Sequence, residues 1–90
     1  MSSIEHIMYR HAFKSGWSGV SRFAQGTSVR DVKNLVSAAL RNGTISQKKS
    51  GFDVVYNAGR TIGTDTNGIG TTFLKVHVNG QGIIRSAYPF

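Results

Sequence analysis

The sequence predicts an α+β domain in which two helices pack on one face of a four-stranded antiparallel sheet. Two helical patterns occupy the first half of the 90-residue chain, and four strand-like runs follow without an interposed helix. Parallel strands would need long, usually helical connections between them, so this order favours antiparallel pairing. A chain of this length supports one hydrophobic core, and we expect a single domain over residues 1–90.

The first helix is expected to run from a serine cap at its start to about residue 13. At 100° per residue, His11 falls on the apolar side of this helix, whereas Arg10 falls on the other side. The following segment, residues 14–26, combines three glycines and three serines with two aromatic residues. This composition is typical of an ordered loop pinned by aromatic side chains, and the loop contains Arg22.

The second helix is expected to begin at Thr27 or Ser28 and to stop at the Asn42-Gly43 pair. Its apolar residues recur at helical spacing, and the opposite arc is polar, so one side should face the core. The polar stretch that follows is predicted to be a connection that can hold Lys48 and Lys49 near a ligand backbone.

Four strands are predicted in the second half of the chain. Residues 52–56 are β-branched and aromatic, and they should form a hairpin with residues 60–63 around a turn at 57–59. A loop at 64–70 then leads into a second hairpin, which occupies residues 71–90.

The second hairpin has the clearest turn signal, because Asn79-Gly80 favours a two-residue turn that would pair Val76 with Ile83. A four-residue turn over 79–82 shifts the pairing by two and keeps every side chain on the same face, whereas a three-residue loop would break the grouping. One face is predicted to be core and to hold Leu74, Val76, Val78, Ile83 and Ala87. The other face is predicted to carry the chemistry and to hold Phe73, Lys75, His77, Ile84, Ser86 and Tyr88.

The charge of the chain points to a polyanionic partner. Eleven Lys and Arg residues stand against four acids, which gives a net charge of +7 although only 17% of residues are charged. The cations are scattered rather than clustered in a tail, so a folded basic surface that meets nucleic acid is expected. There is no cysteine and no long apolar run, so we expect no thiolate metal site, no metal, no other cofactor and no membrane-spanning segment.

Several side chains have the chemistry needed to cleave a phosphodiester. His11 can remove a proton from a ribose hydroxyl, although a histidine on an apolar helix face can equally be a structural residue. Lys75 and His77 share their strand face with Ser86 and Tyr88, a group that can bind phosphate and stabilise an oxyanion, or simply form a solvated face. Arg22 can clamp a phosphate, or be an ordinary surface cation.

Short motifs resemble those of a known group of proteins: RH at residues 10–11, GVSRF at 19–23, an amphipathic helix, and a last strand that ends in SAYP at 86–89. Together they resemble the bacterial toxin ribonucleases carried at the C-termini of contact-dependent growth inhibition and related polymorphic toxins. The chain is similar to the RNase A-like toxin domains over nearly its whole length, and less similar to the bacterial EndoU group.

This resemblance implies a fold of the barnase/EndoU/colicin/RelE type and metal-independent RNA cleavage through a 2′,3′-cyclic phosphate. The family's helix histidine falls on His11, its arginine on Arg22, and its final Thr-x-Tyr on Ser86 and Tyr88. EndoU-like enzymes use a second histidine, a role that His77 can fill as the general acid; otherwise Tyr88 or a water molecule must protonate the leaving oxygen. Contacts to RNA are expected from Lys75, Arg10, Lys48, Lys49 and Arg85.

The same resemblance implies a biological setting. The chain would be the C-terminal piece of a larger secreted or cell-surface toxin, delivered into the cytoplasm of a target bacterium and active there without a membrane. Its partners would be RNA, with tRNA as the first candidate, an acidic immunity protein and, in some systems, a host protein cofactor. The alternative from another functional class is a non-catalytic basic RNA-binding module. A DNA-binding protein fits less well, because no helix shows a helix-turn-helix pattern with a basic reading face.

Overall fold

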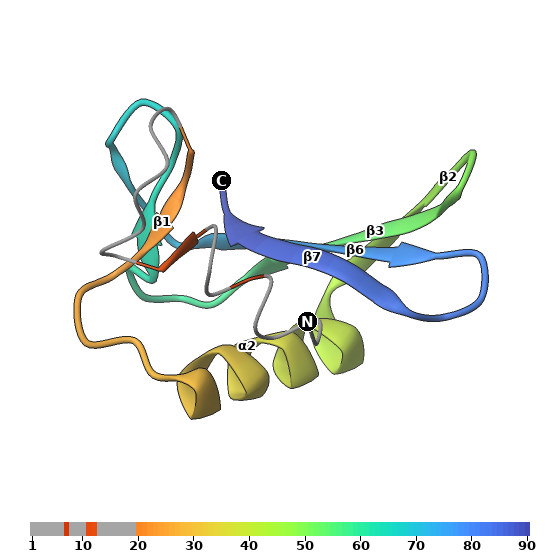
Figure 1. The fold of residues 1–90 in the computed structure, drawn as a ribbon, viewed down its shortest axis with the longest axis horizontal. Helices are drawn as coiled ribbons and strands as arrows, with labels where there is room; N and C mark the ends of the chain where they lie inside the picture. Colours follow the sequence, from red (N-terminus) through yellow and green to blue (C-terminus); the bar gives the residue numbers. More distant parts are fainter. Residues whose placement is uncertain (1–6, 8–10, 13–19) are drawn as a thin grey trace.

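The computed structural model describes residues 7, 11–12 and 20–90 and forms two layers, a four-stranded sheet and a helix that lies along one of its faces (Figure 1). The four-stranded sheet has the order β2-β3-β6-β7, and a smaller sheet at one end has the order β1-β4-β5, with antiparallel pairing throughout. The elements are β1 (Arg22–Phe23), α2 (Val29–Asn42), β2 (Thr44–Lys48), β3 (Gly51–Asn57), β4 (Gly63–Thr64), β5 (Gly70–Thr71), β6 (Phe73–Asn79) and β7 (Ile84–Pro89).

The predicted arrangement of two helices on a single four-stranded sheet is wrong. Within residues 20–90 the structure has one helix, α2, and two antiparallel sheets of three and four strands, so strand dominates. The predicted first helix lies outside the described residues except for Ile7, His11 and Ala12. The barnase/EndoU-type arrangement implied by the resemblance is wrong for the same reason, because the described residues form two sheets and not a single four-stranded one.

Two strand assignments also need correction. The stretch predicted as a polar connection forms β2, which pairs with β3 from Thr44↔Val55 to Lys48↔Gly51. All five residues of β2 are exposed, so this strand is held by its main-chain ladder and has no apolar alternation that a sequence pattern could detect. The predicted hairpin of 52–56 with 60–63 is wrong, because β3 pairs with β2 and β6 while Gly63 and Thr64 form β4 of the small sheet.

Helix α2 begins and ends where the sequence predicts. Ser28 and Asp31 form a capping box: the Asp31 N–H donates to Ser28 Oγ (3.1 Å), and the Ser28 N–H donates to Asp31 Oδ2 (2.9 Å). At the other end the Gly43 N–H donates to the main-chain oxygen of Ala39 (2.7 Å). A side chain at Gly43 would place its Cβ only 2.5 Å from Val54 Cγ1, so the close approach of β3 requires glycine here.

We expect Ser28→Ala to lower the free energy of unfolding by about 1 kcal/mol at neutral pH, because it removes the N-cap acceptor. The hydrogen bonds to Ser28 lower the pKa of Asp31 from its ordinary 3.8. The stability that this carboxylate adds is therefore fully present well above pH 3.8 and is lost as the pH falls through the lowered value. The measurement is urea unfolding at pH 7 and pH 3. Ser37→Ala, on an exposed turn of the same helix, is the control and should not destabilise; equal midpoints for the two variants would contradict the capping role.

The core lies between α2 and one face of the four-stranded sheet. The buried helix residues Val32, Leu35, Val36 and Ala39 belong to the same cluster as Val54 of β3 and three alternate residues of β6. Those three are Leu74, Val76 and Val78, which confirms the predicted core face of this strand. The residues between them point to the other face of the sheet, away from α2.

The turn between β6 and β7 is neither of the two that the sequence suggested. The Asn79 N–H donates to Ile83 O (2.9 Å) and the Gly82 N–H donates to Asn79 O (3.0 Å), which encloses a three-residue loop with Gly82 at φ +82°. Such a loop reverses the predicted faces beside the turn, so Ile83 is exposed and Ile84 packs against the core.

A β-bulge at Arg85 reverses the faces a second time. Val78 pairs with Ile84, but the next pair is His77 with Ser86, so Arg85 is the extra residue. Beyond the bulge Lys75 pairs with Tyr88, and both partners lie on the face that the sequence predicted for them. Two irregularities thus cancel, and the predicted chemical grouping is preserved.

Candidate functional site

The site is built on the sheet face that points away from α2, which we call the outer face. It carries Asp53 of β3, Lys75 and His77 of β6, and Ser86 and Tyr88 of β7. Direct cross-strand pairing places Asp53, His77 and Ser86 in one row and Lys75 and Tyr88 in the next. Paired residues have Cβ atoms about 5 Å apart, so side chains on neighbouring strands within a row are in contact range.

His77 is oriented by Asp53. The Nδ1–H of His77 donates to Asp53 Oδ1 over 2.8 Å, and the side chains are 29% and 17% exposed, respectively. A carboxylate on Nδ1 fixes the tautomer of the neutral ring and leaves its lone pair on Nε2. The pair therefore has the arrangement of a general acid–base group with an orienting carboxylate.

His11 lies beside Tyr88, at the other end of the group. The two rings are stacked, with centroids 5.2 Å apart and an interplanar angle of 22°. The Nδ1–H of the buried His11 ring donates to the main-chain oxygen of Ser21 (2.8 Å), and Ser21 Oγ lies 3.2 Å from the same nitrogen. The carbonyl requires a proton on Nδ1, so in the neutral ring the lone pair lies on Nε2.

Tyr88 is a hydrogen-bond donor at neutral pH. Burial raises the pKa of its phenol, and the negative charge of Asp53 raises it further. The hydroxyl therefore stays protonated across the physiological range and can donate to a phosphate oxygen, but it cannot act as a base there. Lys75, its cross-strand partner, supplies a cation to the same row.

Three of the other predicted site residues, Lys48, Lys49 and Arg85, lie outside this group. Arg22 lies in β1, which packs beside β7, and its side chain is partly buried. Lys48 and Lys49 lie at the β2–β3 turn, and exposed Arg85 lies toward the same end of the sheet. Arg10 falls outside the described residues.

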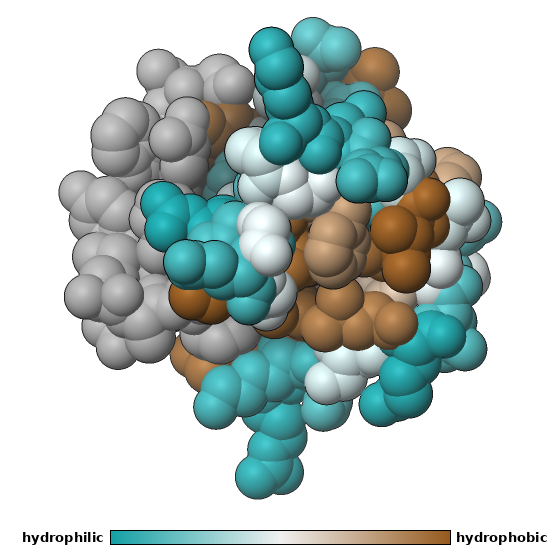
Figure 2. All heavy atoms as spheres, turned by 90° about the vertical axis from the view of Figure 1, so that its right-hand side faces the viewer, coloured by the Kyte–Doolittle hydropathy of each residue, from teal (hydrophilic) through white to brown (hydrophobic). Residues whose placement is uncertain are grey.

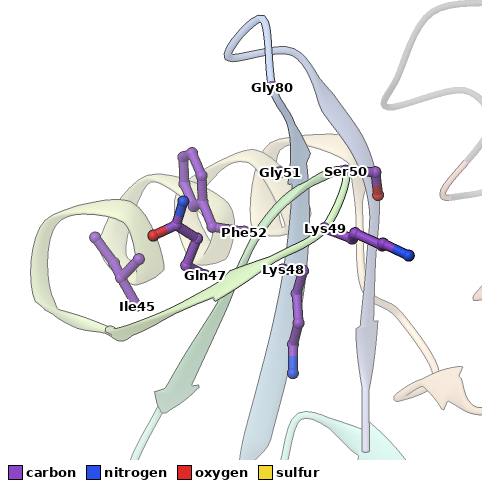
Figure 3. A pocket seen from close by; sticks show the side chains of 8 residues that line it. All are labelled: Ile45, Gln47, Lys48, Lys49, Ser50, Gly51, Phe52 and Gly80. Atoms are coloured by element: carbon purple, nitrogen blue, oxygen red, sulfur yellow. The ribbon is translucent and has the colours of Figure 1, made fainter.

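Lys48 and Lys49 line a separate hollow of about 470 Å³. In Figure 3 the apolar side chains of Ile45 and Phe52 lie to one side of the hairpin, whereas the Lys48 amine points away from them. This end of the molecule faces the viewer in Figure 2, where apolar surface gathers at the centre and hydrophilic residues surround it. The hollow has neither a histidine nor a carboxylate among its lining residues, so the outer face is the better candidate site.

Sequence reasoning missed Asp53 and Ser21. Asp53 is an acid in a predicted strand, residues 52–56, whose other residues are apolar or aromatic. This isolated acid is a detectable signal, but the predicted hairpin with residues 60–63 did not place it beside His77, its actual partner. The role of Ser21 depends on its main-chain oxygen, which no sequence pattern reports.

Within the described residues no three His, Cys, Asp or Glu side chains are grouped closely enough to hold a metal ion. No helix among them is long and apolar enough to cross a membrane. Comparisons with protein-family models, with curated proteins and with solved structures found no match. Function is therefore inferred from the residues of the outer face, and the resemblance to toxin ribonucleases stays a prediction.

Proposed function

We propose that the chain is a metal-independent RNA endonuclease that cleaves through a 2′,3′-cyclic phosphate, with tRNA as the first substrate to test. One observation carries the proposal: two imidazoles, each held at Nδ1, adjoin the same outer-face group, because His77 pairs with Ser86 and His11 stacks on Tyr88, the partner of Lys75. Cleavage of this kind needs one group that removes a proton and one that supplies it, and histidine does both near neutral pH.

His11 is assigned as the base and His77 as the acid. Nε2 of His11 takes the proton of the ribose 2′-hydroxyl while the 2′-oxygen forms its bond to phosphorus. The bond from phosphorus to the 5′-oxygen breaks, and protonated Nε2 of His77 gives its proton to that oxygen. The products are a 2′,3′-cyclic phosphate and a free 5′-hydroxyl, so atoms and protons balance.

The remaining groups stabilise the charge that develops on the phosphate. Lys75 offers a cation, and the hydroxyls of Tyr88 and Ser86 offer donors on the same face. The net charge of +7 adds a long-range attraction for any polyanion.

The test uses purified protein and a short RNA in the presence of EDTA. The expected result is a discrete cut that leaves a 2′,3′-cyclic phosphate, and its loss when the single ribose 5′ to the cut is replaced by 2′-deoxyribose. If the protein bound RNA but cut none of a panel of RNAs that includes total tRNA, the nuclease proposal would be contradicted and the non-catalytic RNA-binding module favoured.

The proposed setting is a toxin that is delivered from a secreted or cell-surface protein into the cytoplasm of a target bacterium. An acidic immunity protein would then cover Lys75, His77, Ser86 and Tyr88, because a basic face favours a carboxylate-rich partner and a cell that makes the nuclease must block it. Growth arrest on induced expression of the chain, absent with His77→Gln, supports toxicity. Unimpaired growth at full expression of the soluble chain would contradict it.

We expect Tyr88→Phe to keep the fold and the ring stack but to lose about 10- to 10³-fold in single-turnover rate, by analogy with the loss of one oxyanion donor. Ser86→Ala should lose a comparable factor, and the double variant less than the product of the two if both hydroxyls serve one phosphate. Thermal melts of each variant check that it is folded. Full activity of Tyr88→Phe in a folded protein would show that the ring is only structural.

RNA affinity is expected to fall steeply as the salt concentration rises. For a single strand, the logarithm of the affinity falls by about 0.7 per log unit of salt for each phosphate that the protein contacts. Lys75→Gln should therefore reduce the slope by about 0.7. Lys33→Gln is the matched control, since Lys33 is exposed on α2 in the other layer. Anisotropy with a 2′-O-methyl RNA between 50 and 200 mM salt measures both slopes, and equal slopes for the two variants would exclude Lys75 as a phosphate contact.

A further inference from the structure

Two exposed phenylalanines continue the outer face beyond Lys75 and Tyr88. Phe73 precedes Lys75 by two residues on β6 and is 41% exposed, and Phe90 follows Tyr88 by two residues and is 38% exposed. Their rings lie 6.0 Å apart at an interplanar angle of 60°. The outer face thus has three successive rows: Phe73 with Phe90, Lys75 with Tyr88, and His77 with Ser86.

Hydrogen bonds hold the main chain that carries the two rings, although the rings are not buried. The Phe90 N–H donates to Phe73 O (3.1 Å), and Thr71 Oγ1 donates to Phe90 O (2.8 Å) while accepting from the Phe73 N–H (3.2 Å). Lys75 Nζ lies 4.5 Å from the centroid of the Phe90 ring. A pair of aromatic rings fixed in this way presents its surface to a ligand at little cost in conformational entropy.

The spacing of the rows matches one nucleotide. Residues two apart on a strand are separated by about 7 Å, so the aromatic row lies about 7 Å from the cationic row. A base joined to its phosphate through one ribose spans a comparable length. A phosphate held at Lys75 and Tyr88 therefore puts the base of an adjoining nucleotide within reach of Phe73 and Phe90.

We propose that Phe73 and Phe90 form a stacking platform for an unpaired nucleobase next to the scissile phosphate. The proposal rests on the proposed function, and it narrows the substrate to single-stranded or loop RNA. A base inside a duplex is stacked on its neighbours and cannot lie on a protein ring, whereas a splayed base can. Every base has a π-face, and no polar group is part of the platform, so little base preference is expected at this position.

The experiment measures binding without cleavage. The probe is a 2′-O-methyl single-stranded hexamer, compared with the same hexamer carrying abasic residues and with a 2′-O-methyl duplex. The wild-type chain is expected to bind the base-bearing single strand most tightly. The variant Phe73→Leu/Phe90→Leu keeps apolar packing but loses the π-faces, and it should bind that strand about 5- to 150-fold more weakly with little change for the abasic strand.

Ile69→Ala is the matched control, because Ile69 is a large exposed apolar residue of the 65–69 loop, outside the four-stranded sheet. It should leave all three affinities unchanged, and thermal melts confirm that each variant is folded. Equal binding of base-bearing and abasic strands by the wild type, or wild-type affinity in the double leucine variant, overturns the platform. Base-dependent binding without any cleavage supports the platform and contradicts the nuclease proposal. Cleavage with base-independent binding supports the nuclease proposal and contradicts the platform.

Discussion

His11→Ala is expected to lower the single-turnover rate of RNA cleavage by about 10²- to 10⁴-fold while RNA affinity changes only a few-fold. Loss of a general acid–base group has an effect of this size, and His11 makes no phosphate contact in the proposed mechanism. The ring lies against Tyr88, and in its neutral form the lone pair is on Nε2 because Nδ1 donates to Ser21 O. Rates come from quenched-flow cleavage under enzyme excess, and affinities from a 2′-O-methyl RNA.

A second variant separates chemistry from packing, since alanine leaves a void beside Tyr88 in a buried place. His11→Phe keeps a ring that can stack on Tyr88 but has no proton to exchange. It loses the hydrogen bond to Ser21 O, which costs about 1–3 kcal/mol of stability for a buried acceptor, so a lower melting temperature is expected. If a folded His11→Phe protein kept more than half of the wild-type rate, His11 would be a packing residue only.

The parts of the fold that the sequence predicts well are those fixed by local interactions. The predicted start of the helix at Thr27 or Ser28 depends on a capping box that spans four residues, and the alternation of Leu74, Val76 and Val78 lies within one strand. Strand pairing is different, because it depends on partners far apart in the chain. β3 pairs with β6, although β4 and β5 of the small sheet lie between them in the sequence. Proximity in the sequence favoured a hairpin of 52–56 with 60–63 instead.

Buried Ile62 explains why that hairpin does not form. The Asn57-Gly59 turn exists, with the Gly59 N–H donating to Asn57 Oδ1 (3.0 Å), but the chain then moves away from β3. Ile62 enters the core, its N–H donates to Thr71 O and its oxygen accepts from Ala24 (both 2.9 Å). Thr71 belongs to β5 of the small sheet and Ala24 directly follows β1, so the competition between the two pairings is decided by tertiary packing.

The site was predictable to the extent that it depends on strand parity. Lys75, His77, Ser86 and Tyr88 were grouped correctly on one face, although the reason differs from the expected one, because the three-residue loop and the bulge at Arg85 offset each other. The orienting partners of the two histidines could not be found from the sequence, since each lies at least ten residues away and depends on tertiary structure.

His77→Gln is expected to lower the single-turnover rate by about 10²- to 10⁴-fold, because glutamine can still donate a hydrogen bond to Asp53 but cannot give a proton to the leaving 5′-oxygen. A modified substrate identifies the role as acid. A substrate with a 5′-thio leaving group needs no proton, so it should be cleaved at nearly equal rates by wild type and variant. Asp53→Asn should cause a smaller loss of rate, because the amide no longer fixes the His77 tautomer. The double variant Asp53→Asn/His77→Gln should be no slower than His77→Gln alone, since the carboxylate acts only through the ring that it orients. Ser46→Ala, opposite Asp53 in the same row, is the control and should keep the wild-type rate. Equal loss by His77→Gln on the oxygen and the sulfur substrates would mean that the leaving group takes its proton from Tyr88 or from water, and His77 would then be a positioning residue for the phosphate.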